Sequence, residues 1–278
     1  MRTIALWSPL PSGSGITALA ASLPVVMALE FKLKTLLLHG GESGGRVEQA
    51  YSLHSQSLDH SLVTFQDHGM SAVDRLAASG RLMPENIRDY TASLLPERLD
   101  LLGGSRETKS ESVETLPCLM TQVIETAVRG YDLIVADAGN GTPNAVDQAI
   151  LNAADLILVG INQNLRSLEM IFENELLLDV IQGKPSGMII GRYDRSSHCT
   201  VQNVKRRFGV KGILEGIPYC SQLTDAWNTR TVLTCIQRGR GGMDRKRESP
   251  LYQALRSTSL AAVEQLGLPS AGYSERGA

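Results

Sequence analysis

The stretch that decides the fold runs from Leu6 to Thr17 and reads LWSPLPSGSGIT. It overlaps the end of a short apolar run, residues 4–7, and precedes a segment rich in alanine and leucine, residues 18–29. The pattern predicts a strand, a glycine-rich loop and the start of a helix. An ordinary turn between a strand and a helix has the same composition, so the rest of the chain must decide the role of this loop.

A phosphate-binding loop is the functional alternative for this stretch. Such a loop ends in G-x-G-K-[ST]: the glycines expose backbone N–H groups to phosphate, the lysine reaches the β- and γ-phosphates, and the hydroxyl binds Mg²⁺. Gly13, Gly15 and Thr17 occupy matching positions, but Ile16 stands where the lysine belongs. The sequence therefore keeps the shape of a phosphate loop and lacks its charge.

The composition is that of a chain with a large core and no dominant charge. Of 278 residues, 42% are hydrophobic, and 27 basic residues nearly balance 29 acidic ones. This balance argues against a protein that coats nucleic acid. The four cysteines have no C-x-x-C spacing, so neither a zinc site nor a disulfide framework is indicated. We find no linker at which to divide the chain and expect residues 1–278 to form a single domain.

No charged residue occurs from Thr3 to Leu29, which raises the question of a signal peptide or a membrane span. Prolines and glycines between Pro9 and Gly15 divide this stretch into pieces too short to cross a bilayer as one helix. We therefore expect a soluble, cytoplasmic protein without an integral membrane span.

Strand-like and helix-like segments alternate along the chain, which predicts an α/β fold with a doubly wound, mainly parallel sheet and helices on both faces. Ligands are then expected beyond the carboxyl ends of the strands, where Gly15 and Asp137 should flank one crevice. Pro24 is expected to kink or split the first helix. The expected strands are residues 4–7, 35–38, 99–102, 131–137, 156–161, 187–190 and 212–214. The expected helices are residues 16–30, 119–128, 144–153, 167–181, 200–208 and 250–266, with irregular helical pattern over residues 43–98 and a basic loop over residues 237–247.

The order of these motifs resembles the ParA/MinD group of P-loop ATPases. Members of that group have a deviant loop K-G-G-x-G-K-[ST], a second strand ending in D-x-D, and a strand Y-D-x-[IV]-[IV]-x-D. A strand A-D-x-x-[IL]-[VL], an N-R-Y-like segment and an I-P-x-[DS] element follow. The matching segments here are residues 13–17, 131–137, 154–159, 189–194 and 217–219, so the resemblance covers roughly residues 3–265.

The departures from that group fall on its charged and base-reading residues. Ile16 replaces the phosphate lysine, and Pro11 replaces the signature lysine that reaches the partner's nucleotide across the dimer interface. His39 and Gly41 align with the two aspartates of D-x-D, the second of which is associated with activating the attacking water. Gly191 aligns with the asparagine that reads adenine. Loss of one charge-assisted contact alone costs about 1.5–3 kcal/mol.

These residues lead us to expect a degenerate nucleotide site. The resemblance implies that Asp137 orients a Mg²⁺ shell; a helix-capping or turn aspartate is the alternative. His39 is expected to be a surface residue, with a role as a base in place of the missing carboxylate as the lesser alternative. Ile16→Lys is expected to supply a cation without restoring hydrolysis. The predicted site comprises Ser12, Gly13, Ser14, Gly15, Ile16, Thr17 and Asp137, and Thr17 and Asp137 would hold Mg²⁺ if the ion is bound.

The resemblance implies a ParA/MinD-like pseudo-ATPase that acts as a localisation or assembly factor. Within the group it is most similar to the TadZ/CpaE subgroup, which positions pilus or secretion machinery at the cell envelope. No cofactor, or only weakly bound ATP or ADP with Mg²⁺, is expected. The expected partners are a second copy of the chain and proteins of an envelope-associated assembly, which could recruit it to the membrane or cell pole. The alternatives are a slow ATPase with an unconventional loop and a partition-type, DNA-associated ATPase, which the missing lysines disfavour.

Overall fold

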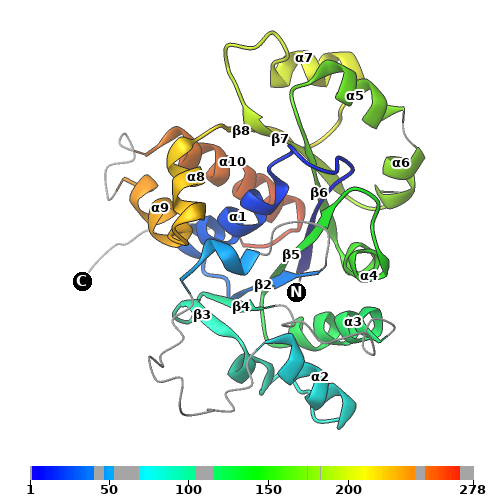
Figure 1. The fold of residues 1–278 in the computed structure, drawn as a ribbon, viewed down its shortest axis with the longest axis vertical. Helices are drawn as coiled ribbons and strands as arrows, with labels where there is room; N and C mark the ends of the chain where they lie inside the picture. Colours follow the sequence, from blue (N-terminus) through cyan, green and yellow to red (C-terminus); the bar gives the residue numbers. More distant parts are fainter. Residues whose placement is uncertain are drawn as a thin grey trace.

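The structure, a computed structural model, describes residues 2–40, 47–52, 69–103, 115–173, 175–181, 183–241 and 248–269. These residues form an eight-stranded sheet flanked by helices (Figure 1). The strands lie in the order β3-β4-β2-β5-β1-β6-β7-β8, and all neighbours are parallel except β3, which runs antiparallel to β4. The predicted doubly wound, mainly parallel α/β fold is therefore confirmed.

The elements of the described chain have the following bounds. The strands are β1 (Arg2–Ser8), β2 (Thr35–His39), β3 (Ala92–Leu95), β4 (Leu99–Leu102), β5 (Leu133–Asn140), β6 (Leu156–Ile161), β7 (Ser186–Tyr193) and β8 (Leu214–Pro218). The α-helices are α1 (Ile16–Glu30), α2 (Met70–Ala78), α3 (Leu116–Ala127), α4 (Ala145–Ala153), α5 (Leu165–Phe172), α6 (Glu175–Ile181), α7 (Val201–Phe208), α8 (Ser221–Asn228), α9 (Val232–Gly239) and α10 (Pro250–Gln265). Two 3₁₀ helices are η1 (Val47–Ala50) and η2 (Ile87–Tyr90).

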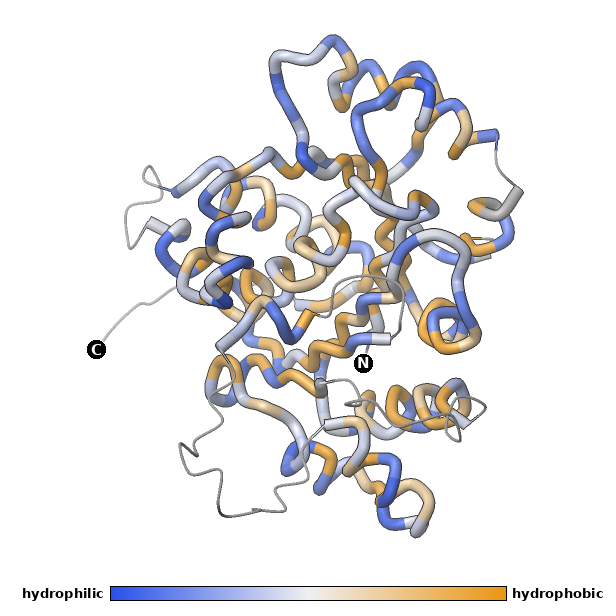
Figure 2. The backbone as a smooth tube through the Cα atoms, in the orientation of Figure 1, coloured by the Kyte–Doolittle hydropathy of each residue, from blue (hydrophilic) through white to orange (hydrophobic). Residues whose placement is uncertain are grey.

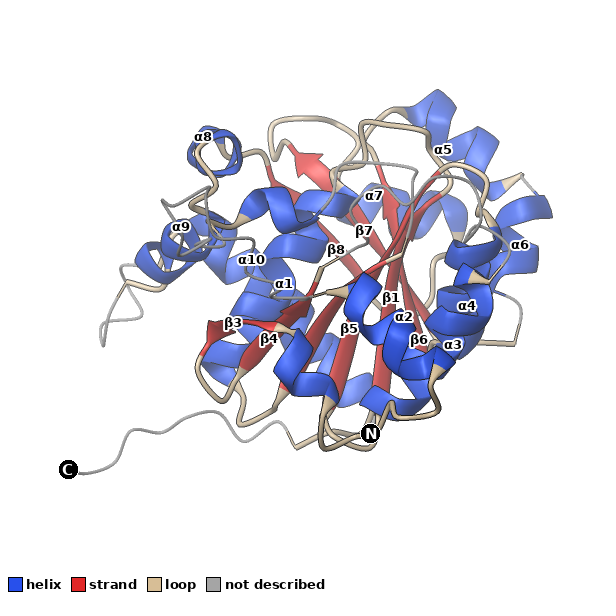
Figure 3. Cartoon of the chain, turned by 60° about the horizontal axis from the view of Figure 1, so that its bottom comes forward, coloured by secondary structure: helices blue, strands red, loops and turns tan. Residues whose placement is uncertain are grey.

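Helices cover both faces of the sheet, whose strands lie among them in Figure 3. Successive strand residues point to opposite faces, so Leu6 belongs to the core cluster that includes α1, α8, α9 and α10, whereas Trp7 belongs to the cluster that includes α2 to α7. Both faces are apolar, and Figure 2 shows hydrophobic residues along the central strands. Burial on both sides is why these strands are nearly continuous runs of leucine, isoleucine and valine.

Helix α1 spans the predicted residues without a break, although Pro24 lies inside it. A proline within a helix costs about 3 kcal/mol because it removes a hydrogen bond and crowds the preceding turn. Eleven of the helix's fifteen residues are buried, and each large apolar side chain that is buried contributes about 1.5–3 kcal/mol. Packing thus outweighs the proline, and the expectation that Pro24 splits the helix was wrong.

Several other segments differ from the sequence prediction. The segment predicted as irregular helix contains a strand, β3, which pairs with the adjacent β4 at the sheet edge. The predicted strand at residues 131–137 is shifted and continues past Asp137 to Asn140, because Ser8 of β1 pairs with that residue. Helices α8 and α9 have no predicted counterpart, and residues 237–239 of the expected basic loop belong to α9. Residues 242–247 of that loop lie outside the described residues.

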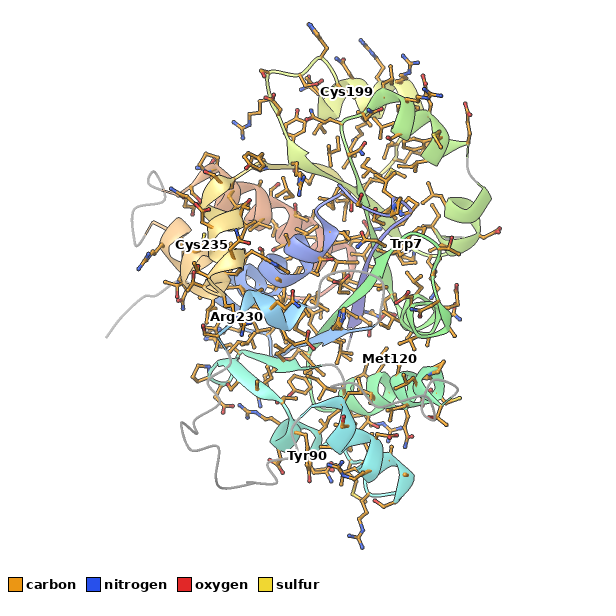
Figure 4. The ribbon with its side chains drawn as sticks, in the orientation of Figure 1. Trp7, Tyr90, Met120, Cys199, Arg230 and Cys235 are labelled. Atoms are coloured by element: carbon orange, nitrogen blue, oxygen red, sulfur yellow. The ribbon has the colours of Figure 1, made fainter. Side chains whose placement is uncertain are left out.

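The turn after β5 is held against the end of β1 by Trp7. This side chain, labelled near the centre of Figure 4, is fully buried, and its indole N–H donates to the Gly141 carbonyl at 3.0 Å. The Gly141 N–H donates to the Ser8 carbonyl at 2.8 Å. These bonds place the loop after β1 beside the end of β5. Within the described chain, no helix is both long and apolar enough to span a membrane.

Candidate functional site

The glycine-rich loop joins β1 to α1 at the carboxyl edge of the sheet, where parallel sheets bind ligands. Gly13 and Gly15 have φ angles of +86° and +70°, in the left-handed region that favours glycine. A Cβ at either position would meet no atom within 4 Å, so backbone conformation rather than space requires glycine. Gly15 is the N-cap of α1 and has no side chain to cap it, so the first N–H groups of the helix are suited to an anion.

Ile16, at the position of the phosphate lysine, is a core residue in this structure. Its side chain is 1% exposed and packs between α1 and the sheet. It lies on Gly160 of β6, where a Cβ would come within 2.9 Å of the Ile16 Cδ1 atom. Side chain and glycine therefore fit each other, and a lysine at residue 16 would have to enter this apolar packing.

The loop backbone also lies directly on strand β7. A Cβ at Gly191 would collide with the carbonyl oxygen of Ser14, so any side chain at residue 191 would push the loop away. This is the physical reason for glycine at the position that the resemblance aligns with an adenine-reading asparagine. On the other side, the Ser14 hydroxyl lies 3.5 Å from Oδ1 of Asn140, at the end of β5.

Asp137 lies on β5 beside the loop and is 1% exposed. The Gly139 N–H donates to its Oδ1 at 3.1 Å, and the Thr17 side chain also hydrogen-bonds the carboxyl group. Burial outweighs both bonds and raises the pKa of Asp137 to about 7. The two residues predicted to hold Mg²⁺, Thr17 and Asp137, are therefore in contact, but burial disfavours the ionised form of the carboxyl group that a metal ion requires.

His39, at the end of β2, is buried rather than exposed, so the expectation of a surface histidine was wrong. It is 5% exposed, and its Nδ1 lies 4.0 Å from Oδ2 of Asp137. Strand pairing causes this burial, because His39 is the register partner of Asp137. The charges of Asp147 and Glu48 raise the pKa of Asp137 further. Four titratable residues thus lie near one another, and we call them the acid half of the site: His39 of β2, Glu48 of η1, Asp137 of β5 and Asp147 of α4.

A cavity of about 440 Å³ opens on the other side of the loop. Strands β6, β7 and β8 and helices α1, α8 and α10 contribute residues to it, and most of these are apolar. We call this side the apolar half of the site. Arg192 of β7 is the single charged residue among the described residues that line it.

All of the predicted loop residues line this cavity, and one of them, Thr17, contacts Asp137. Gly41, aligned with the second D-x-D aspartate, lies outside the described residues. Asn140, Asp147 and the cavity itself were not predicted from the sequence. The position of Asp147 was predictable, because Asn144 and Asp147 have the spacing of a capping box and form that box at the start of α4. The residues predicted for the loop that line the cavity are Ser12, Gly13, Ser14, Gly15, Ile16 and Thr17.

The sheet order, the glycine loop between β1 and α1, and the aspartate on the neighbouring strand define a P-loop type of α/β fold. No protein-family model matches the chain, and no curated protein matches it. Solved structures do match, and ParA family and MinD proteins are among them. The chain therefore has the ParA/MinD fold, although identities below one fifth extend the likeness no further than the fold.

Three of these structures illustrate the similarity. The ParA family ATPase from Chlorobium tepidum matches with a TM-score of 0.71 and 18% identity, over 93% of this chain and 98% of that one. The septum site-determining protein MinD from Pyrococcus horikoshii, complexed with Mg-ADP, matches with a TM-score of 0.68 and 18% identity, over 96% of this chain and 98% of that one. A chain of the MinC:MinD cell division protein complex from Aquifex aeolicus matches with a TM-score of 0.66 and 17% identity, over 95% of this chain and 96% of that one.

Proposed function

We propose that this chain is a ParA/MinD-like pseudo-ATPase that localises or assembles a partner through protein contacts. The observation that carries the proposal is the burial of Ile16. A protein that turns over ATP needs a cation at the β- and γ-phosphates, and here the corresponding side chain is packed on Gly160. The absence of lysine and arginine from residues 8–17 supports the same conclusion.

The surroundings of Asp137 support the proposal from the magnesium side. A hard cation such as Mg²⁺ is bound by ionised carboxylates and water. Asp137 has a pKa raised to about 7 by burial, and the group 4.0 Å from its Oδ2 is the imidazole of His39 rather than a second carboxylate. Among the described residues, no group of three or more His, Cys, Asp and Glu residues is arranged to hold a metal ion. The side chains present therefore fit Mg·ATP poorly, and we derive no hydrolytic step.

The proposal includes a homodimer that forms without nucleotide, through the face that carries the loop. Pro11 is exposed at this face and Ile16 is buried beneath it, so the face carries less cationic charge than one with the two lysines of the ParA/MinD pattern, and self-association here requires no anion between the subunits. A protein partner fits the same fold, since the solved relative from Aquifex aeolicus is a MinC:MinD complex. The machinery served by this chain, a pilus, secretion or similar envelope assembly, is part of the proposal.

The test is to measure ATP affinity and phosphate release for the wild type, Asp137→Ala and Asp137→Asn, together with light scattering with and without ATP and Mg²⁺. We expect weak or absent binding, no turnover in any variant, and a dimer under both conditions. Asp137→Asn is the matched control, because it keeps the size of the side chain and removes the ionisable group.

Turnover by the wild type that disappears in both Asp137 variants would overturn the proposal. It would favour the second candidate, a slow ATPase that uses Thr17, Asp137 and the loop N–H groups. The contact between Thr17 and Asp137 is the observation that favours this candidate. A monomer at high protein concentration under both conditions would exclude the dimer and leave a monomeric adaptor.

A further inference from the structure

The apolar half of the site is large enough for a small molecule in its own right. Its volume of about 440 Å³ lies within the range of roughly 300–1,000 Å³ of small-molecule pockets. Most such pockets are lined by hydrophobic and aromatic side chains, with few polar groups that fix orientation. The ligand class inferred below rests on the proposal that the loop does not hold Mg·ATP.

Large apolar side chains from three sets of elements line the cavity. Leu19 comes from α1, Ile189 and Ile217 come from the sheet, and side chains of α8 and α10 close the space. Such a wall stabilises hydrocarbon or aromatic groups and penalises the polar edge of a base or a phosphate chain. The large apolar residues that line it are Leu19, Ile189, Ile217, Leu223, Trp227, Leu251 and Leu255.

Two features that favour an anion lie where the cavity meets the loop. The first turn of α1 follows Gly15 there, and its N–H groups favour an anion. Arg192 lines the same cavity, directly after the Gly191 that touches Ser14. The β7–β8 register shifts between Ile190 and Tyr193, and Arg192 has a φ of +51°. An irregularity of this kind re-aims a side chain, and a non-glycine residue rarely adopts such a φ.

We propose that this cavity binds a small amphipathic anion: an apolar body against the α1, α8 and α10 side chains, and one anionic group at the loop N–H groups and Arg192. The arrangement separates an apolar interior from a cationic end, as an acyl chain or aromatic ring system with one carboxylate or sulfonate requires. Such a ligand needs neither the lysine that Ile16 replaces nor a magnesium ion.

The experiment uses two fluorescent probes with the same ring system. 8-Anilinonaphthalene-1-sulfonate has an anionic group, and N-phenyl-1-naphthylamine is the same molecule without it. We expect both to bind the full chain in a saturable manner. Ser22 lines the cavity and is fully buried, and its hydroxyl donates to the Ala18 carbonyl of its own helix. Ser22→Leu should fill the space and weaken both probes about tenfold.

A second variant keeps the test meaningful if Ser22→Leu does not fold. Thr224 of α8 also lines the cavity but is exposed, so Thr224→Phe should obstruct it without disturbing the core. Gln222→Phe on the same helix is the matched control, because Gln222 is exposed and does not line the cavity. Weakened binding in Thr224→Phe but not in Gln222→Phe supports the proposal. Unchanged binding in both cavity variants overturns it.

Arg192→Gln separates the anionic end from the apolar body. We expect the sulfonate probe to bind about fivefold more weakly, as for loss of an exposed ion pair, and the neutral probe to be unaffected. Equal weakening of both probes would overturn the role of Arg192. Probe binding that depends on the cavity in a protein that also hydrolyses ATP would leave the cavity in place and refute the pseudo-ATPase proposal, so the two failures are distinguishable.

Discussion

The two halves of the site lie on either side of the glycine-rich loop and are built from the same kind of element, the carboxyl ends of parallel strands. In the acid half, β2 ends in His39, and its register partner on β5 is Asp137; both are buried, and His39 Nδ1 lies 4.0 Å from Asp137 Oδ2. In the apolar half, the neighbouring strands β6, β7 and β8 border a cavity whose lining includes Arg192 as its charged member. A loop that would hold one phosphate chain thus separates two very different environments.

The comparison shows that burial acts in opposite directions on the two sides. In the acid half it opposes ionisation, so Asp137 has a raised pKa although it accepts hydrogen bonds. In the apolar half it favours contact with apolar groups, because most of the lining side chains there are apolar. Ile16 belongs to the packing that separates them, since its side chain is in the core cluster and borders the cavity.

The largest expected effect is that of Ile16→Lys on stability, which would break the boundary between the halves. The lysine would replace a buried apolar side chain and carry a charge into apolar packing, so we expect a loss of about 4 kcal/mol in the free energy of unfolding. Urea unfolding at pH 7 measures it. Ile16→Val is the control and should cost about 1 kcal/mol. A lysine variant as stable as the wild type would show that residue 16 faces the loop rather than the core.

The next effect is expected from Gly191→Ala, which tests the contact between loop and β7. A Cβ there collides with the Ser14 carbonyl oxygen, which is backbone and cannot rotate away. We expect a loss near the upper end of overpacking costs, about 3 kcal/mol, in the same unfolding assay. In the control Gly103→Ala, the Cβ would lie 3.4 Å from the Glu48 side chain, an ordinary contact, so little change is expected. Equal results for the two variants would contradict the loop position.

The smallest expected effect is the pH dependence of the unfolding free energy, which tests the protonation of Asp137 in the acid half. Because the pKa of Asp137 is raised in the folded state to about 7, the folded protein binds more protons than the unfolded one between about pH 4 and pH 7. Its contribution to stability is therefore present at low pH and is lost as the pH rises through 7. We expect a loss of about 1 kcal/mol per pH unit between pH 5 and pH 7, attributable to this group.

Asp137→Asn isolates that contribution, because the other ionisable groups are shared by both proteins. Subtracting the two pH profiles of unfolding free energy should give a difference that rises in favour of the variant as the pH increases. His39, Asp147 and Glu48 lie around the group and remain in both proteins. Parallel profiles would mean that Asp137 is ionised at neutral pH and that the acid half is more polar than its burial indicates.

The sequence by itself determined the fold class and the place of the loop. Apolar runs of strand length alternate with helical segments, and this pattern survives in the structure with β4, β6 and α1 at the predicted residues. The glycines at residues 13 and 15 signalled a backbone conformation that other residues rarely adopt, and both have positive φ. These features are local, since they depend on neighbouring residues in the chain.

Only the tertiary structure decided what the site residues face. Burial of Ile16 requires Gly160, and the loop position requires Gly191; both glycines are far away in sequence. The burial of His39 depends on its pairing with Asp137, and the cavity depends on α8 and α10 closing over α1 and the sheet. Such contacts leave no periodic pattern in the sequence. A side chain's charge state and accessibility are set by the packed neighbours that replace water around it, and packing joins residues that the chain keeps apart.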